Sequence, residues 1–208
     1  MQPVSIPGGC QAILLAGGRA RRLGRASKPL LRVHGATLLD HAIAAANDLA
    51  CAPIIAVGAE LPSEAPVHWT REDPPFGGPA AGIVAGLSTG QSPGTTDAEW
   101  TLVLACDLPR ARSAARLLAD SATHLPSDSD GLCLGDTSSR PQWLTGLYRT
   151  AALHAAALRM SAAGTDAPVR DLMAELAITV ITDPGDLSTD IDTWDDFHSV
   201  NQQSEEQQ

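Results

Sequence analysis

The sequence predicts an α/β fold with a mostly parallel central sheet flanked by helices. Short apolar runs typical of buried strands alternate along the chain with Ala- and Leu-rich segments of helical spacing. Hydrophobic residues make up 44% of the chain but aromatic residues only 3%, so small aliphatic side chains must fill the core. Strands covered by helices on both faces have this composition. A chain of 208 residues fits one such domain, which we place at residues 10–201, between a flexible lead-in (1–9) and a disordered tail (202–208).

The first elements of the domain form a strand–helix–strand unit. Residues 12–15 and 53–57 are apolar and are followed closely by glycine, as buried strands often are. Between them, Thr37 and Asp40 form a capping-box signature that predicts a helix running to about Leu49. This order predicts a βαβ unit, in which the crossover is almost always right-handed.

The remaining elements continue the alternation. Strands are predicted at residues 67–70, 100–105, 131–134, 143–148 and 178–181, with a short extended piece at 30–33. Helices are predicted at residues 80–87, 113–125, 151–160 and 169–176, and a last short helix begins after Thr193. Residues 88–99 are polar and rich in Gly and Pro, which favours an irregular connection.

Composition and charge exclude several classes of function. A formal net charge of -10 argues against general nucleic-acid binding, because affinity for a phosphate backbone requires a basic face. No stretch approaches the roughly 20 apolar residues of a membrane span and the N-terminus lacks a signal-peptide pattern, so we expect a cytoplasmic protein without membrane contact. The four cysteines lack metal-ligand spacing, the six histidines are scattered, and no Ser or Cys lies in a nucleophile elbow, so zinc chemistry and hydrolytic triads have no support.

The stretch after the first strand combines a bare backbone with positive charge. Gly17 and Gly18 follow the strand directly, and five of the chain's 14 basic residues come next: Arg19, Arg21, Arg22, Arg25 and Lys28. Exposed amides beside cations suit a polyphosphate, for which Arg22 offers a planar fork and Lys28 a point charge. The stretch is neither a G-x-G-x-x-G nor a GK[ST] loop. The alternative is a tight turn beside a solvated basic helix.

Carboxylates follow the ends of other predicted strands. Asp107 comes after strand 100–105 and Asp73 after strand 67–70, and parallel strands bring such ends to one edge of a sheet. Asp107 suits Mg²⁺, which takes one or two carboxylates together with phosphate oxygens. Asp190 and Asp192 could supply a second carboxylate. The alternatives are that Asp107 only caps a turn and that Asp192 or Thr193 only caps the last helix.

Four motifs in this order resemble the signature of a known family. They are Leu15-Ala16-Gly17-Gly18 with Arg22-Leu23-Gly24 and Lys28, Gly78-Pro79-Ala80-Ala81-Gly82, Cys106-Asp107-Leu108-Pro109, and Asp190-Ile191-Asp192-Thr193. Over residues 12–197 the chain is similar to the MobA-like nucleotidyltransferases. The resemblance implies a Rossmann-like three-layer sandwich that binds a nucleoside triphosphate with Mg²⁺.

The resemblance also implies roles for individual residues. Nucleotide binding would fall to Leu15, Ala16, Gly17, Gly18, Lys28, Asp73, Gly78 and Asp107. Arg22, Lys28 and Asp107 would be the catalytic residues, and Asp107 would bind the metal ion. Asp192 is our candidate for a second metal ligand, and Asp190 and Asp192 are candidates for contact with the acceptor.

Within the family, the resemblance is closest to the molybdenum cofactor guanylyltransferases. It implies transfer of GMP from GTP to the phosphate of molybdopterin, with transient contacts to molybdenum cofactor biosynthesis proteins and client apo-enzymes. Residues 140–144 and 169–172 follow the guanylyltransferase pattern, whereas Asp190-Ile191-Asp192-Thr193 is common in cytidylyltransferases and Ser27 replaces the more usual Asp. The alternatives are a cytidylyltransferase, an enzyme acting on phospholactate or a sugar phosphate, and a GTP-binding cofactor-delivery protein without catalysis.

Overall fold

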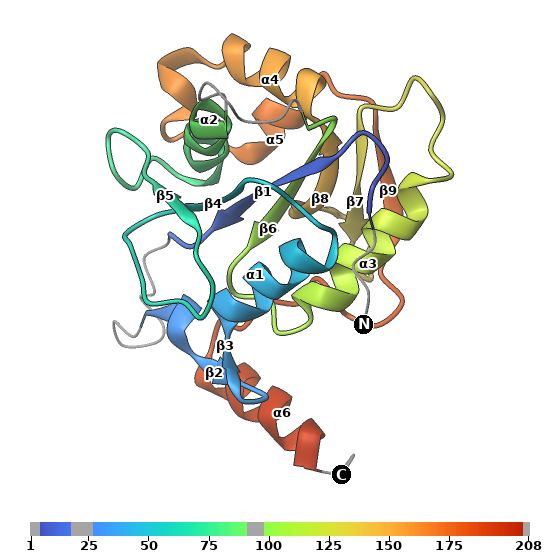
Figure 1. Ribbon diagram of the computed structural model, residues 1–208. Helices are drawn as coiled ribbons and strands as arrows, with labels where there is room; N and C mark the ends of the chain where they lie inside the picture. Colours follow the sequence, from blue (N-terminus) through green and yellow to red (C-terminus); the bar gives the residue numbers. More distant parts are fainter. Residues whose placement is uncertain (1–4, 18–26, 91–97, 206–208) are drawn as a thin grey trace.

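A seven-stranded sheet forms the centre of the molecule, as a computed structural model of residues 5–17, 27–90 and 98–205 shows (Figure 1). The expectations for residues 1–4, 91–97 and 206–208, and those for Gly18 and Arg22, lie outside these described residues. The strands of the sheet are β1 (Cys10–Leu15), β4 (Ile54–Val57), β5 (His68–Thr70), β6 (Trp100–Ala105), β7 (Gly131–Gly135), β8 (Pro141–Arg149) and β9 (Ile178–Thr182). The helices are α1 (Leu38–Asp48), α2 (Pro79–Gly90), α3 (Ala111–Ala122), α4 (Thr150–Arg159), α5 (Val169–Met173) and α6 (Trp194–Glu205), with 3₁₀ turns at Lys28–Leu30 and Ser161–Gly164.

The order of the strands creates a switch point beside β1. The sheet runs β5-β4-β1-β6-β8-β7-β9, and β1 pairs in parallel with both β4 and β6. The chain therefore builds β4 and β5 on one side of β1 before returning to its other side with β6. Strand β8 is antiparallel to both β6 and β7, and the other described pairings in this sheet are parallel. The carboxyl ends of β1, β4, β5 and β6 consequently share one edge.

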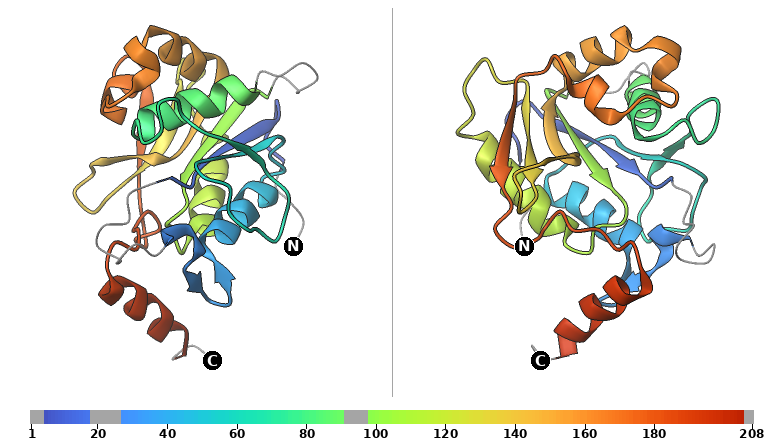
Figure 2. Two further views of the ribbon diagram at one scale, coloured as in Figure 1. Left: turned by 90° about the vertical axis from the view of Figure 1, so that its left-hand side faces the viewer. Right: turned by 180° about the vertical axis from the view of Figure 1, so that it is seen from behind.

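Alternating side chains divide the core into two layers. Leu14 and Leu104 pack on one face of the sheet against α1 and α3, whereas Ile13 and Val103 pack on the other against α2, α4 and α5. This alternation follows from the two-residue period of a strand. Figure 2 shows the helices on both sides of the sheet. The predicted three-layer α/β sandwich with a mostly parallel sheet is therefore confirmed.

Several element boundaries differ from those expected. Helix α2 continues to Gly90, into the segment expected to be an irregular connection, and within it Gly86 packs its backbone close to Ile13. Helix α5 ends at Met173, and α6 extends to Glu205, beyond residue 201. Of the extended piece expected at 30–33, Leu30 belongs to a 3₁₀ turn, and the rest leads into a short hairpin made of β2 (Arg32–Val33) and β3 (Ala36–Thr37).

The hairpin and α6 form a small module beside the sandwich. In Figures 1 and 2 both project from the same end of the molecule, away from the central sheet. The module has its own apolar cluster of Val33, Leu38 and Ile191, against which Phe197 and Val200 of α6 pack. At its base, Thr37 Oγ1 accepts a hydrogen bond from Asp40 N at 3.0 Å, which confirms the predicted cap of α1.

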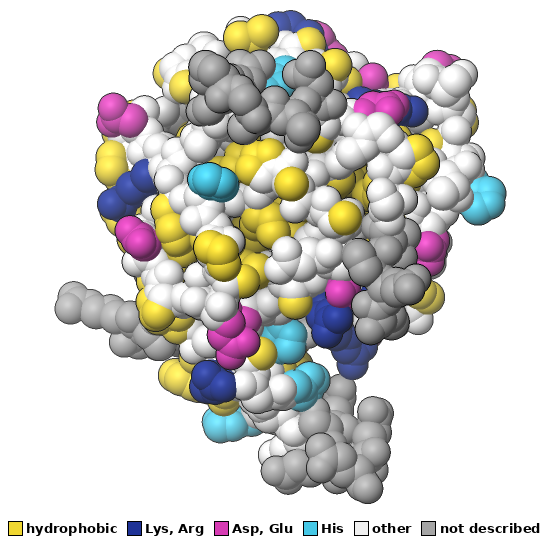
Figure 3. All heavy atoms as spheres, viewed as in Figure 1, with side chains coloured by type: hydrophobic (Ala, Val, Ile, Leu, Met, Phe, Trp, Pro, Cys, Tyr) yellow, Lys and Arg dark blue, Asp and Glu magenta, His cyan; other side chains and the backbone are white. Residues whose placement is uncertain are grey.

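The described surface carries its charges in small groups. On the face seen in Figure 3, the Lys and Arg side chains of the described residues are scattered among Asp, Glu and His, and hydrophobic side chains gather near the middle. Among the described helices, none has the length and apolar character needed to cross a membrane.

An ion pair between α1 and α3 provides a test of how these two helices pack against each other. Asp48 accepts hydrogen bonds from Arg112 at 2.9 Å and from Arg116 at 2.7 Å, and these arginines hold the pKa of Asp48 below its usual value. A lowered carboxyl pKa stabilises the fold above the unfolded-state pKa, and this contribution is lost as the pH falls through the folded-state value. Asp48→Asn should therefore lower the free energy of unfolding by about 1 kcal/mol or less at neutral pH, after solvent screening, and by less near pH ~3, which is below the unfolded-state pKa of about 4.

Urea denaturation at the two pH values measures this difference. Asp120→Asn is the matched control, because it removes the same charge from the exposed side of α3 outside the ion pair. An equal loss of stability for Asp48→Asn at both pH values would contradict the proposed contribution.

Candidate functional site

The loops that follow β1 and β6 lie side by side at the switch point. Beyond the strands themselves, Cys106 N donates to Leu15 O at 3.0 Å and Ala16 N donates to Val57 O at 2.9 Å. These hydrogen bonds carry the sheet pairing one residue further and place Gly17 near Asp107. Ligands of parallel α/β sheets bind at such edges, where the strand order reverses.

Gly58 allows the loop after β1 to pack closely against the end of β4. Its φ of +145° lies in the region that favours glycine, and a Cβ at this position would lie 3.0 Å from Gly17 N. A larger residue in place of Gly58 would therefore push Gly17 away from the end of β4.

A cavity of about 520 Å³ lies at this edge of the sheet. Its lining residues come from the ends of β1, β4 and β6, from β8, from the start of α2 and from the loops around them: Leu15, Gly17, Val57, Glu72, Phe76, Gly78, Pro79, Gly82, Ala105, Asp107, Leu144 and Asp166. Four of the expected nucleotide-binding residues are among them, namely Leu15, Gly17, Gly78 and Asp107. Ala16 is buried beside the cavity, and Asp73 is exposed in the loop next to Glu72, which takes its place in the lining.

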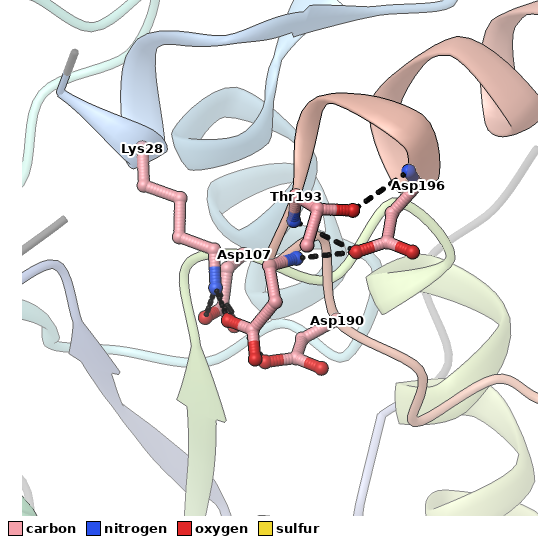
Figure 4. A network of polar contacts seen from close by, with 6 residues as sticks. Lys28, Asp107, Asp190, Thr193 and Asp196 are labelled. Carbon is pink, nitrogen blue, oxygen red and sulfur yellow. Dashed lines mark hydrogen bonds and ion pairs between the residues drawn. The ribbon is translucent and has the colours of Figure 1, made fainter. Parts of the chain in front are cut away.

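Lys28 brings the other predicted carboxylates to Asp107. Its Nζ donates to Asp107 Oδ2 at 2.8 Å and to Asp192 Oδ1 at 2.7 Å, and it lies 3.5 Å from Asp190 Oδ2 (Figure 4). We call these four residues the Lys28 cluster. Their formal charges sum to a net negative value because three carboxylates surround one ammonium. Asp107 therefore does not merely cap a turn.

Burial and charge act in opposite directions in this cluster. Burial alone would lower the pKa of Lys28, but the charge of Asp107 and hydrogen bonds to Asp107 and Asp192 outweigh it and raise that pKa above its usual value. Burial raises the pKa of Asp190, and the negative charge of Asp107 adds to this effect while Lys28 opposes it. Lys28 thus stays protonated. Its positive charge offsets the repulsion between Asp190 and the carboxylates of Asp107 and Asp192.

The segment carrying Asp190 and Asp192 is anchored on both sides. Ile191 between them is fully buried in the module's apolar cluster, and its N–H donates to Asp107 O at 3.2 Å. Because side chains alternate along an extended segment, both carboxylates then face away from that cluster. At the start of α6, Asp196 N donates to Thr193 Oγ1 at 3.2 Å, so Thr193 caps the helix, while the carboxylate of Asp192 contacts Lys28.

Asp183 shapes the loop that leads to this segment. Its carboxylate accepts hydrogen bonds from the backbone N–H groups of Gly185, Leu187 and Ser188. Burial tends to raise the pKa of Asp183, but these donors outweigh it and lower that pKa. The residue was not singled out in the sequence, where Asp183 precedes a Pro-Gly turn without a motif.

The chemistry of the Lys28 cluster fits a divalent cation. Asp107 Oδ1 is buried and has no hydrogen-bond partner among the described residues, so one hard oxygen donor is available beside the cavity. The described residues contain no group of three or more His, Cys, Asp or Glu side chains arranged to hold a metal ion by themselves. In Mg²⁺ sites of proteins, phosphate oxygens and water complete the coordination of one or two carboxylates.

An irregularity in β8 contributes the far wall of the cavity. Cys133 of β7 pairs with Gly146, whereas the next residue, Leu134, pairs with Gln142, so residues 143–145 bulge out of the β7–β8 ladder. Tyr148 is fully buried and its hydroxyl donates to Trp143 O at 2.8 Å, a hydrogen bond that fixes the first residue of the bulge. Leu144 is thereby turned toward the cavity. Bulges often direct side chains in this way next to functional sites.

The phenol of Tyr148 can be tested directly, because it is the only tyrosine in the chain. Burial raises its pKa well above the usual value. The folded protein should therefore show no tyrosinate absorbance as the pH rises through about 10, while the urea-unfolded chain should titrate normally. Stability should fall above that pH, because the unfolded state loses the proton more easily. Identical titration curves for the two states would contradict the buried hydrogen bond.

The fold and the site define a nucleotidyltransferase of the α/β class: a parallel switch point, a glycine-flanked cavity and a lysine–carboxylate cluster at its edge. A family model, the MobA-like NTP transferase domain, matches residues 12–181, and the chain belongs to this family. It is therefore a transferase, and membership of the family implies a divalent metal ion. Among curated relatives, a "Probable molybdenum cofactor guanylyltransferase" of Synechococcus elongatus is 35% identical over 147 residues, covering 67% of this chain and 72% of the relative.

Solved structures share the architecture at lower identity. The molybdopterin-guanine dinucleotide biosynthesis protein A of Archaeoglobus fulgidus superimposes with a TM-score of 0.66 and 17% identity, covering 94% of this chain and 99% of that chain. A nucleotidyl transferase of Methanothermobacter gives a TM-score of 0.70 at 16% identity, covering 96% and 99%. These similarities support the three-layer fold.

Proposed function

We propose that the chain is a molybdenum cofactor guanylyltransferase, which transfers GMP from GTP to the phosphate of molybdopterin and releases pyrophosphate. The observation that carries this proposal is the Lys28 cluster at the edge of the cavity, within a chain that is 35% identical to a relative named for this activity. A metal-binding carboxylate and a lysine suited to phosphate lie together there, as transfer of a nucleotidyl group requires.

The roles of the site residues are part of the proposal. Leu15, Ala16, Gly17 and Gly78 would bind the nucleotide, with its phosphates toward Lys28. Asp107 would hold Mg²⁺, with Asp192 as a candidate second ligand, and Asp190 would lie nearer the acceptor. The expected parts of Gly18 and Arg22 in phosphate binding, and of Asp73 beside the nucleotide, stay predictions.

Catalysis would rest on position and charge. The attacking phosphate oxygen of molybdopterin is already an anion, so no general base is needed, and the mechanism does not depend on a His or Cys. Lys28 would balance the negative charge that develops on the departing pyrophosphate, and the cavity would hold the two substrates in line. Bound Mg²⁺ supplies Lewis-acid stabilisation of the same charge.

Pyrophosphate release separates this function from its alternatives. Purified protein, Mg²⁺ and molybdopterin should release pyrophosphate with GTP, and much less with CTP or ATP. Preference for CTP would indicate a cytidylyltransferase, and activity only with phospholactate or a sugar phosphate would change the acceptor. Binding of GTP without pyrophosphate release, in the presence of a competent acceptor, would instead indicate a delivery protein.

Two further parts of the proposal concern the protein's surroundings. Its product would pass to client apo-enzymes, so transient contacts with these and with molybdenum cofactor biosynthesis proteins are expected. A cytoplasmic location is proposed because the four cysteines are free and buried, which suits a reducing compartment.

A further inference from the structure

We infer that Lys28 competes with the divalent metal ion for Asp107 and Asp192, so that the metal binds tightly only when a polyphosphate draws the Lys28 ammonium away. The inference rests on the proposed function, because it concerns the same metal and the same nucleotide. It adds a coupling between them that is built into the Lys28 cluster.

The first observation behind this inference is that Lys28 already binds the carboxylates that would hold the metal. The Nζ atom lies 2.8 Å from Asp107 Oδ2 and 2.7 Å from Asp192 Oδ1, both within the range of a charge-assisted hydrogen bond. Each carboxylate offered to the metal therefore already uses one oxygen to bind an internal cation. A metal ion that approached Asp107 would meet the ammonium's positive charge in the same place.

The second observation is the burial of Lys28 and of one oxygen of Asp107. The side chain of Lys28 is only 17% exposed, so water screens its charge poorly. At the same time, Asp107 Oδ1 is buried without a partner among the described residues, which keeps one donor of the pair unused. The cluster is thus a cation site in which Lys28 satisfies part of the negative charge and leaves the remainder unbalanced.

A polyphosphate reverses this balance. Its oxygens offer Lys28 an alternative set of acceptors beside the cavity, and the long side chain can turn without moving the backbone. Once the ammonium leaves, the metal meets the negative charge of Asp107 and Asp192 without a competing internal cation. Metal and nucleotide should therefore bind with positive cooperativity, and by linkage each raises the affinity for the other by the same factor.

Titration with Mn²⁺ in the absence of nucleotide tests the competition. Lys28→Met keeps the length of the side chain but removes its charge, and it should bind Mn²⁺ at least about tenfold more tightly than the wild type, as measured by electron paramagnetic resonance. Arg32→Met is the matched control, because it removes an exposed cation from β2, outside the cluster, and should leave Mn²⁺ affinity unchanged. Equal or weaker Mn²⁺ binding by a folded Lys28→Met variant would overturn the inference.

A double variant identifies the site of the gain. Adding Asp107→Asn to Lys28→Met should remove the tighter Mn²⁺ binding; a gain that survives in the double variant would place the metal elsewhere and overturn the inference.

The single lysine permits a second, independent readout. Lys28 is the only lysine among the 208 residues, so protein labelled with ¹³C- and ¹⁵N-lysine gives one lysine side-chain signal in nuclear magnetic resonance. Addition of α,β-methylene-GTP in the presence of a metal chelator should shift this signal. Binding of the analogue without any shift would contradict the movement of Lys28.

The outcome of these measurements can be separated from that of the test of the proposed function. The Mn²⁺ titration contains no nucleotide or acceptor, so an unchanged affinity in Lys28→Met would reject the competition even if pyrophosphate is released with GTP. Conversely, tighter Mn²⁺ binding by Lys28→Met together with no pyrophosphate release by the wild-type protein would support the competition and reject the guanylyltransferase.

Discussion

Asp107→Asn should reduce the rate of pyrophosphate release by about a hundredfold or more. The substitution keeps the shape of the side chain but removes the negative charge that faces both Lys28 and the cavity. Loss of one group that stabilises charge in a transition state typically costs this much. Turnover is measured with saturating GTP, molybdopterin and Mg²⁺, and thermal unfolding confirms that the variant is folded.

Asp186→Asn is the control for this experiment. Asp186 is exposed in the loop between β9 and the Lys28 cluster, so its replacement removes the same charge from a neighbouring position and should leave turnover near the wild-type value. If a folded Asp107→Asn protein also turns over at a near-normal rate, Asp107 has no part in catalysis and the assignment of the site is wrong.

Lys28→Met should lower turnover to a similar extent, about a hundredfold or more. The ammonium that would oppose the growing negative charge of pyrophosphate is lost, whereas the stem of the side chain still fills its place. The same variant is expected to bind Mn²⁺ more tightly, so metal affinity and turnover should change in opposite directions. A purely structural role for Lys28 would weaken both.

Arg32→Met again provides the comparison, and Lys28→Arg gives a second one. Arginine retains the positive charge but not the compact shape of the ammonium, so it should restore part of the lost turnover. Full activity in Lys28→Met would exclude Lys28 from the chemistry.

Local patterns in the sequence were enough to predict much of the sheet. Strand β6 occupies residues 100–105 as expected, because an apolar run of this length between polar segments has few other solutions. Strand order was not predictable in the same way. Insertion of antiparallel β8 between β6 and β7 depends on pairings between distant segments, and the two-residue strands of the β2–β3 hairpin are too short to show a period.

The candidate site was predicted in its parts but not in its connections. Local motifs predict Asp107, Lys28 and Asp192 one by one, yet the contact of Lys28 with Asp192 joins residues 164 positions apart. Glu72 rather than Asp73 lines the cavity because the direction in which the loop turns decides which neighbour faces inward. Asp166 reaches the cavity from a loop without a motif, where its N–H donates to Gly77 O at 2.7 Å.

The burial of Ile191 connects the position of α6 with the position of two carboxylates of the Lys28 cluster. This residue is packed in the module formed by the hairpin and α6, while the carboxylates on either side of it face Lys28. A shift of α6 would be passed through one residue to both carboxylates.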